Sequence, residues 1–138
     1  MTDRPATVPM LHRFLGIGLV TLTALALVGK FFGVVPMLPP DDVTAKIAYV
    51  MSALSAGVIG YALLVLKPRA QVRTATQSVD QFWKTPANVT LVLPVWFLLE
   101  GAGVVAVVAY GTTGNPVAAA AMAVGVIAFW MSGPAKFA

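Results

Sequence analysis

The sequence predicts an all-α membrane protein: a bundle of four transmembrane helices with both termini in the cytoplasm. Two properties of the composition lead to this fold class. Hydrophobic residues make up 59% of the 138 residues and charged residues only 10%, whereas a soluble domain carries about 25% charged residues. A chain this short cannot enclose so much apolar surface in water, and its mean hydropathy of +0.87 fits a lipid environment. We therefore expect residues 1–138 to form one integral membrane domain.

Four apolar segments supply the expected helices. The first covers about residues 11–35 and contains Lys30, and the second covers about residues 43–66. The breaker PMLPP separates them, and Asp41 or Asp42 can cap the second helix. Spanning the hydrocarbon takes about 20 apolar residues, so both segments are long enough. The length of the first segment also favours an uncleaved anchor over a secretory signal.

The third and fourth helices are expected over about residues 86–110 and 116–132. Thr85 and Asn115 each stand directly before a proline, which is the pattern of a capping residue followed by the first helical position. The connecting loop, GTTGNP, is short and rich in glycine, so it predicts a tight hairpin. The fourth segment is the shortest and reaches spanning length only if Ser132 and its neighbours belong to it.

The polar loop of residues 67–85 is expected to contain a short amphipathic helix that lies in the membrane interface. Apolar side chains recur on one helical face and charged side chains on the other, as in helices that lie flat on a membrane. The apolar face holds Val72, Ala75, Val79, Phe82 and Trp83. The charged face holds Arg69, Arg73, Asp80 and Lys84. An ordinary solvated linker is the alternative.

The basic residues predict the orientation. With the N-terminus inside, the inner segments hold Arg4, Arg13, Lys67, Arg69, Arg73, Lys84 and Lys136. The outer loops hold Lys30 and Lys46, offset by Asp41 and Asp42. Because cytoplasmic segments are enriched in lysine and arginine, both termini should be cytoplasmic. We expect the multi-pass chain to reside in a cell inner membrane, in a bacterium.

The composition also excludes several classes of function. The chain has no cysteine, which rules out disulfides and thiol nucleophiles. Its single histidine, His12, cannot form a histidine metal cluster, and we expect it to face the lipid headgroups beside Arg13. No nucleophile–base pair, phosphate loop or metal-ligand cluster is visible, so we expect no enzyme, no cofactor and no metal. The basic residues are spread over loops, which argues against nucleic acid as a partner.

Glu100 is the residue that points most directly to a function. It lies in the otherwise uncharged stretch of residues 92–110, and an ionisable residue inside a membrane is a functional hypothesis by default. Pro94 is expected to kink this helix and to free the carbonyl of Thr90 one turn earlier. A free carbonyl near a carboxyl group would make a proton or cation site.

Lys30 offers Glu100 a structural role instead. Lys30 follows Arg13 by 17 residues, and Glu100 follows Lys84 by 16. If Arg13 and Lys84 mark the same boundary, the rises are about 25 and 24 Å, and Lys30 and Glu100 share a level. They would then form an intramembrane ion pair that sets register or binds a partner. If Lys30 instead extends to the surface, Glu100 stays free to titrate.

Small and aromatic residues complete the candidate positions. Close helix packing in lipid relies on small residues, which we assign at Ala53, Ala56, Gly57, Gly60, Gly101, Gly103 and Gly125. They pack either within the bundle or against another subunit. The aromatics near predicted helix ends, Trp83, Tyr110 and Trp130, are expected to anchor the helices at the membrane interface.

These features predict a small polytopic membrane protein that acts as a non-catalytic accessory or assembly subunit of a larger membrane complex. Its expected partners are the lipid bilayer and other membrane protein subunits, or further copies of itself. The alternative is a proton- or cation-coupled small transporter or channel that works as a homo-oligomer around Glu100. Oligomerisation is required there because one copy has too few polar groups for a solute path.

Overall fold

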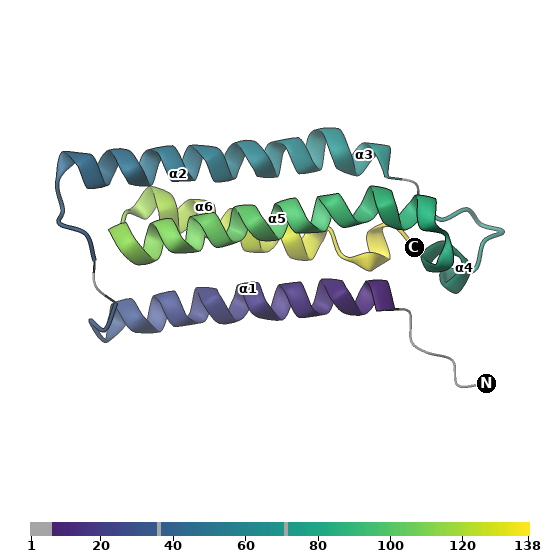
Figure 1. Cartoon of the computed structure of the whole chain (residues 1–138), viewed down its shortest axis with the longest axis horizontal. Helices are drawn as coiled ribbons and strands as arrows, with labels where there is room; N and C mark the ends of the chain where they lie inside the picture. The colour runs from purple at the N-terminus through teal and green to yellow at the C-terminus, as the bar shows by residue number, and fades with distance from the viewer. Residues whose placement is uncertain (1–6, 36, 71) are drawn as a thin grey trace.

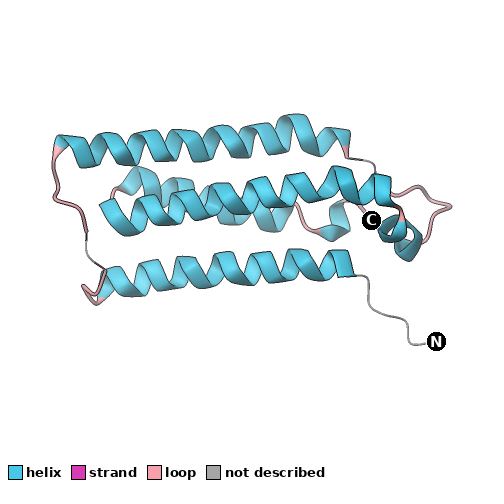
Figure 2. Cartoon of the chain, viewed as in Figure 1, coloured by secondary structure: helices cyan, strands magenta, loops and turns pink. Residues whose placement is uncertain are grey.

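The computed structural model describes residues 7–35, 37–70 and 72–138, and within them every regular element is a helix (Figure 2). Arg4, part of the predicted inner charge, and Pro36, part of the breaker, lie outside this range. Three helices are long and apolar enough to cross a membrane: α1 (Thr7–Phe31), the continuous helix Asp42–Arg69, and α5 (Pro86–Thr113). The chain is therefore an all-helical protein with the composition of an integral membrane protein.

The fourth apolar helix, α6 (Pro116–Met131), is shorter than the other three. Its 16 residues rise about 24 Å, less than the roughly 30 Å of bilayer hydrocarbon. The helix ends because Ser132, with φ −104° and ψ 28°, leaves the helical conformation. Length alone does not establish a fourth membrane crossing, which stays a prediction.

The helix α5 is the central element of the bundle (Figure 1). It contacts α1, α6 and α2 (Asp42–Tyr61), and 44% of its most apolar stretch is buried, against 11% for α1. The start of α1, the end of α6 and the short helix α4 (Val79–Lys84) lie at one end of the bundle. We call it the basic end, because it carries Arg13, Lys67, Arg69, Arg73, Lys84 and Lys136.

The predicted capping residues begin two of the three helices. The Asp41 carboxylate accepts a 2.8 Å hydrogen bond from the Thr44 N–H, and the Asn115 side chain caps α6 in a similar way. Thr85 does not cap α5, since its hydroxyl donates to the Gln81 carbonyl at 2.7 Å. That prediction is wrong because α4 ends directly before α5 and gives the hydroxyl a nearer acceptor.

Two left-handed glycines set helix lengths. α1 begins at Thr7, earlier than predicted, and stops at Phe31, because the chain turns at Gly33 with φ +66°. α5 runs beyond its predicted end to Thr113, and Gly114 follows with φ +64°. Glycine adopts this conformation without the steric cost that a Cβ brings, so both positions favour glycine.

A π-helical turn, Ala62–Leu66, lies inside the second long helix. The chain continues from it into α3 (Lys67–Arg69), so this helix ends three residues beyond its predicted boundary at residue 66. A π turn takes up one extra residue. Beyond it, the Lys67 ammonium donates to the Ser132 hydroxyl at 3.3 Å, which ties this helix to the end of α6.

The predicted interfacial segment forms less helix than its pattern suggests. Apart from α3, which ends the preceding long helix, the helical part of its described residues is α4, six residues long. Ser78 begins α4 with a capping box in which Ser78 and Gln81 exchange hydrogen bonds. Phe82 and Trp83 are 1% and 5% exposed, because they pack into the bundle. The two large side chains of α4 therefore close the core at the basic end.

A pair of glycines brings α5 and α6 into close contact. A Cβ added at Gly125 would lie 3.0 Å from the Gly103 Cα, and a Cβ added at Gly103 would lie 2.8 Å from the Leu19 side chain of α1. Because both side chains are absent, three helices approach closely here, as helices in lipid do at small residues. Two of the predicted packing positions lie at this contact.

Candidate functional site

The helices α1 and α5 run in parallel with a constant offset in sequence number. Three contacts define this register, each between residues 84 positions apart: His12 with Trp96, Leu19 with Gly103, and Lys30 with Gly114. A residue of α1 therefore lies level with the residue of α5 that is 84 positions later. This register decides which polar groups of the two helices can meet.

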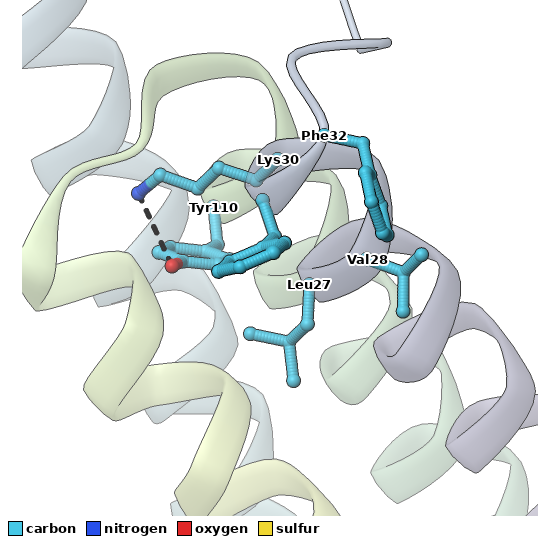
Figure 3. A pocket seen from close by; sticks show the side chains of 6 residues that line it. Leu27, Val28, Lys30, Phe32 and Tyr110 are labelled. Carbon is cyan, nitrogen blue, oxygen red and sulfur yellow. Dashed lines mark hydrogen bonds between the residues drawn. The ribbon is translucent and has the colours of Figure 1, made fainter.

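Lys30 lies in the last turn of α1, at the end of the bundle opposite the basic end, and Figure 3 shows it beside Tyr110. Its ammonium donates to the Tyr110 hydroxyl at 3.1 Å and to the Gly114 carbonyl at 3.2 Å, and it lies 4.2 Å from the centre of the Tyr110 ring. Beside this contact, apolar side chains such as Leu27 and Phe32 line a cavity of about 590 Å³. The lysine is thus held by cation–π attraction and hydrogen bonds.

The predicted ion pair between Lys30 and Glu100 is absent from a single chain. Tyr110 lies ten residues beyond Glu100, about 15 Å along the helix axis. The prediction is wrong because it placed Arg13 level with Lys84. In the observed register Arg13 lies level with residue 97, which is 13 residues or about 20 Å beyond Lys84.

Glu100 lies near the midpoint of α5, 14 residues after Pro86 and 13 before Thr113. Its side chain is partly exposed, and a Cβ at the adjacent Gly101 would face open space. The hydrogen bonds that lysine and arginine side chains donate within residues 7–35, 37–70 and 72–138 go to other acceptors. In a helix that crosses the bilayer, this carboxyl group would lie near the centre, where charge is costly. Among the described residues, no lysine or arginine side chain thus donates a hydrogen bond to Glu100.

The predicted site that combines Glu100 with the Thr90 carbonyl does not form. α5 continues through Pro94 without interruption, and the Thr90 hydroxyl donates to the Pro86 carbonyl at 2.7 Å. Thr90 lies ten residues before Glu100, about 15 Å along the axis. The two groups are far apart because a proline frees a carbonyl toward the helix N-terminus, whereas Glu100 follows Pro94.

Most of the small residues predicted to pack helices lie on outer faces. Ala53, Ala56 and Gly57 of α2 are exposed, and a Cβ at Gly57 or Gly60 would meet no atom within 4 Å. The same holds for Gly101 of α5. These positions therefore make no close helix contact within the chain and leave smooth surfaces for another molecule.

A groove of about 540 Å³ runs between α2 and α6, and we call it the α2/α6 groove. Small side chains form much of its wall, among them Ala53 and Ala56 on α2 and Ala120 and Ala121 on α6. Ser52 also lines the groove and is 5% exposed. Among the described residues, its hydroxyl is the one buried side-chain polar atom without a hydrogen-bond partner. Such an atom is uncommon in native structures, and this one is covered by its own chain rather than open to the groove.

The only histidine lies inside the bundle rather than at the headgroups. His12 is 2% exposed and stacks on the Phe129 ring, with centroids 4.3 Å apart and planes 5° apart. Its Nε2 lies 3.2 Å from the Phe129 carbonyl, and because a carbonyl only accepts, Nε2 carries the proton. The sequence did not predict the contact between His12 and Phe129, because the two residues come from distant segments that no motif connects.

The three predicted aromatic anchors lie in different environments. Trp83 packs on Trp96, with centroids 5.8 Å apart, and is a core residue rather than a surface anchor. Trp130 is 45% exposed at the basic end, where a ring at headgroup level stays a prediction. Tyr110 is partly buried and lies against the Lys30 ammonium at the opposite end. Of these three aromatics, Trp130 is the one with an exposed ring.

No group of three or more histidine, cysteine, aspartate or glutamate side chains within the described ranges could hold a metal ion. No protein-family model matches the chain, and no curated protein or solved structure matches it either. The contacts described above are therefore the basis for a functional assignment.

Proposed function

We propose that this protein is a non-catalytic accessory or assembly subunit of a larger membrane complex. The observation that carries the proposal is the α2/α6 groove, whose wall is formed largely by small residues. Helices in lipid associate through close packing at small residues and through hydrogen bonds between helices. The groove offers close packing at small residues to a transmembrane helix of a partner subunit.

The neighbouring Ser55 makes the contact that Ser52 lacks. Ser55 is 1% exposed, and its hydroxyl donates to the Ala102 carbonyl of α5 at 2.8 Å. That hydrogen bond joins two helices of this chain. The Ser52 hydroxyl is covered by its own chain, so it could donate to a partner helix only after its side chain rotates toward the groove.

The topology that accompanies this proposal has four membrane-spanning helices, with the basic end in the cytoplasm of a bacterial cell. Asp80 is the one described acidic residue near the six basic residues of that end, whereas Asp41 and Asp42 balance Lys30 and Lys46 at the other. An excess of lysine and arginine marks the cytoplasmic side of an inner membrane. A thinner local bilayer would let the short α6 cross it.

Single cysteines can test this topology, because the chain contains none. Thr76→Cys places a thiol in the exposed loop at the basic end, and Pro40→Cys places one in the exposed loop at the opposite end. A membrane-impermeant maleimide applied to intact cells should label the Pro40 variant alone. Labelling of the Thr76 variant alone would reverse the orientation.

The groove is tested by the size of the particle that carries the chain. Ala56→Leu fills the groove, and Ala24→Leu, on the exposed face of α1, is the matched control. Native electrophoresis after gentle solubilisation should give one large particle for the wild type and the control, and mass spectrometry should identify its other subunits. Ala56→Leu should release the chain as a smaller particle. An unchanged particle for Ala56→Leu would exclude the groove as the contact surface.

A proton- or cation-coupled transporter that works as a homo-oligomer around Glu100 is the second candidate. It is favoured by the position of Glu100 near the midpoint of α5 and by the absence of a described cation beside it. Glu100→Gln keeps the shape of the side chain and removes its charge. Loss of transport in an intact homo-oligomer would favour this candidate. Loss of a heteromeric particle would instead assign Glu100 to assembly.

A further inference from the structure

We propose that a cavity at the basic end binds the phosphate group of an anionic ligand. The cavity has a volume of about 340 Å³ and lies between the start of α1 and the chain that follows α6. Arg13 and Lys136 line it together with the Trp130 ring and Pro9. This volume lies within the range of small-molecule sites, and we call the cavity the basic cavity.

The segment that carries Lys136 is fixed to the bundle. It forms a short helix, η2 (Pro134–Lys136), and the next side chain, Phe137, is 2% exposed and packs on the Trp96 ring with centroids 6.2 Å apart. On the other side of η2, the Ser132 carbonyl accepts a 2.7 Å hydrogen bond from the Trp96 indole. Because both flanks are held, Lys136 stands at a defined wall of the basic cavity.

The face of α1 that borders the basic cavity changes from charged to apolar along its length. Pro9, Arg13, Gly16 and Val20 recur at helical spacing on one face. Arg13 follows Pro9 by one turn near the start of α1. Further along, Gly16 packs against the Trp130 ring, and Val20 is 45% exposed. A phospholipid has the same order, with a phosphate above apolar chains, so the arrangement fits a lipid headgroup better than a free phosphate ion.

The charge at the basic cavity also favours an anion. None of the residues that line it is acidic, so a negative group would meet only attractive side-chain charges there. Guanidinium and ammonium groups donate strong hydrogen bonds to phosphate oxygens. Basic pockets between transmembrane helices on the cytoplasmic side bind anionic headgroups in this way.

The test compares lipids on the purified full-length chain. Native mass spectrometry from a neutral detergent measures binding of phosphatidylglycerol and of phosphatidylcholine with the same acyl chains. The variant Arg13→Gln/Lys136→Gln removes both cations of the basic cavity. Arg69→Gln/Lys84→Gln removes the same charge from exposed residues of the same end that do not line it. We expect the first variant to lose roughly 30-fold in phosphatidylglycerol affinity, and the second to keep its preference.

A charge-conserving variant and a free anion sharpen the result. Arg13→Lys/Lys136→Arg should recover the preference for phosphatidylglycerol, and circular dichroism should give the same helix content for every variant. Inorganic phosphate is added as a competitor. If it displaces the lipid, the ligand is a free phosphate; if the lipid stays bound, the ligand is the lipid headgroup. Equal losses in both glutamine variants, or none in the cavity variant, would overturn the proposal.

Discussion

The indole N–H of Trp96 donates a 2.7 Å hydrogen bond to the carbonyl oxygen of Ser132. Both residues are fully buried, and the bond joins the first half of α5 to the residue that follows α6. A buried carbonyl that loses its donor keeps the cost of desolvation. The contact is therefore a sensitive point of the fold and leads to the first prediction.

Trp96→Phe should destabilise the protein by about 1–3 kcal/mol, because it keeps an aromatic ring and leaves the Ser132 carbonyl without a donor. Trp96→Ala should cost about 3–5 kcal/mol, since it also leaves a cavity. Unfolding in mixed micelles with increasing dodecyl sulfate, followed by circular dichroism, measures both. Trp130→Phe, at a 45% exposed ring, is the control and should cost under about 1 kcal/mol. Equal stability of the Trp96→Phe and Trp130→Phe variants would contradict the importance of the bond.

Gly125→Ala should destabilise the contact between α5 and α6. The new Cβ would lie 3.0 Å from the Gly103 backbone, which cannot give way as a side chain can, and overpacking typically costs about 1–3 kcal/mol. Gly57→Ala, where a Cβ meets no atom within 4 Å, should instead stabilise the helix by about 0.5–1 kcal/mol. The same micelle titration compares them, and a stability loss of equal size in the two variants would rule out close packing as the cause.

Lys30 should couple energetically to Tyr110 and not to Glu100. A double-mutant cycle with Lys30→Met and Tyr110→Leu should give a coupling of about 0.5–2 kcal/mol from the cation–π contact and its hydrogen bond. The cycle with Lys30→Met and Glu100→Gln should be additive within about 0.5 kcal/mol, as for distant sites. A larger coupling to Glu100 than to Tyr110 would restore the intramembrane ion pair.

The cap at the start of α2 should depend on acidic pH. The Thr44 backbone N–H donates to the Asp41 carboxylate and lowers the pKa of Asp41 below its usual 3.8. A lowered folded-state pKa means that the cap is fully present above the ordinary value and fades as pH falls through the lowered one. The amide proton shift of Thr44, followed by nuclear magnetic resonance in micelles, should titrate with a midpoint below 3.8. Asp41→Asn should abolish this titration, and a midpoint above 3.8 would contradict the cap.

The helices could be predicted because their signals are local. Apolar runs locate them, and residues such as Asp41, Asn115 and Gly114 mark their ends through capping and left-handed backbone. Glu100 could be chosen as a candidate on the same basis, since one charge in an apolar helix is visible in the sequence. Predicted bounds missed by a few residues where a turn such as Ala62–Leu66 has no sequence signature.

The relative levels of the helices could not be predicted, because they depend on contacts between distant segments. The register of α1 and α5 follows from side chains that fit together, such as Leu19 against Gly103, and not from where Arg13 or Lys84 stands in its own helix. The burial of Trp83 likewise depends on Trp96, which belongs to another element. A pattern within one helix therefore identifies Glu100 as unusual but cannot name its neighbours.

The π turn Ala62–Leu66 rotates the last three residues of its helix, Lys67–Arg69, relative to the part that precedes it. Successive residues of an α-helix are about 100° apart, and the extra residue of a π turn displaces everything after it by about that angle. Lys67 points to Ser132 only with this displacement, whereas Ser52 and Ser55 precede it and are unaffected. Removing one residue from the turn would swing Lys67 away from α6 and leave the α2/α6 groove intact. The side chains before and after the π turn thus face independently chosen directions around one helix axis. A change in the turn reorients the residues after it while those before it keep their direction.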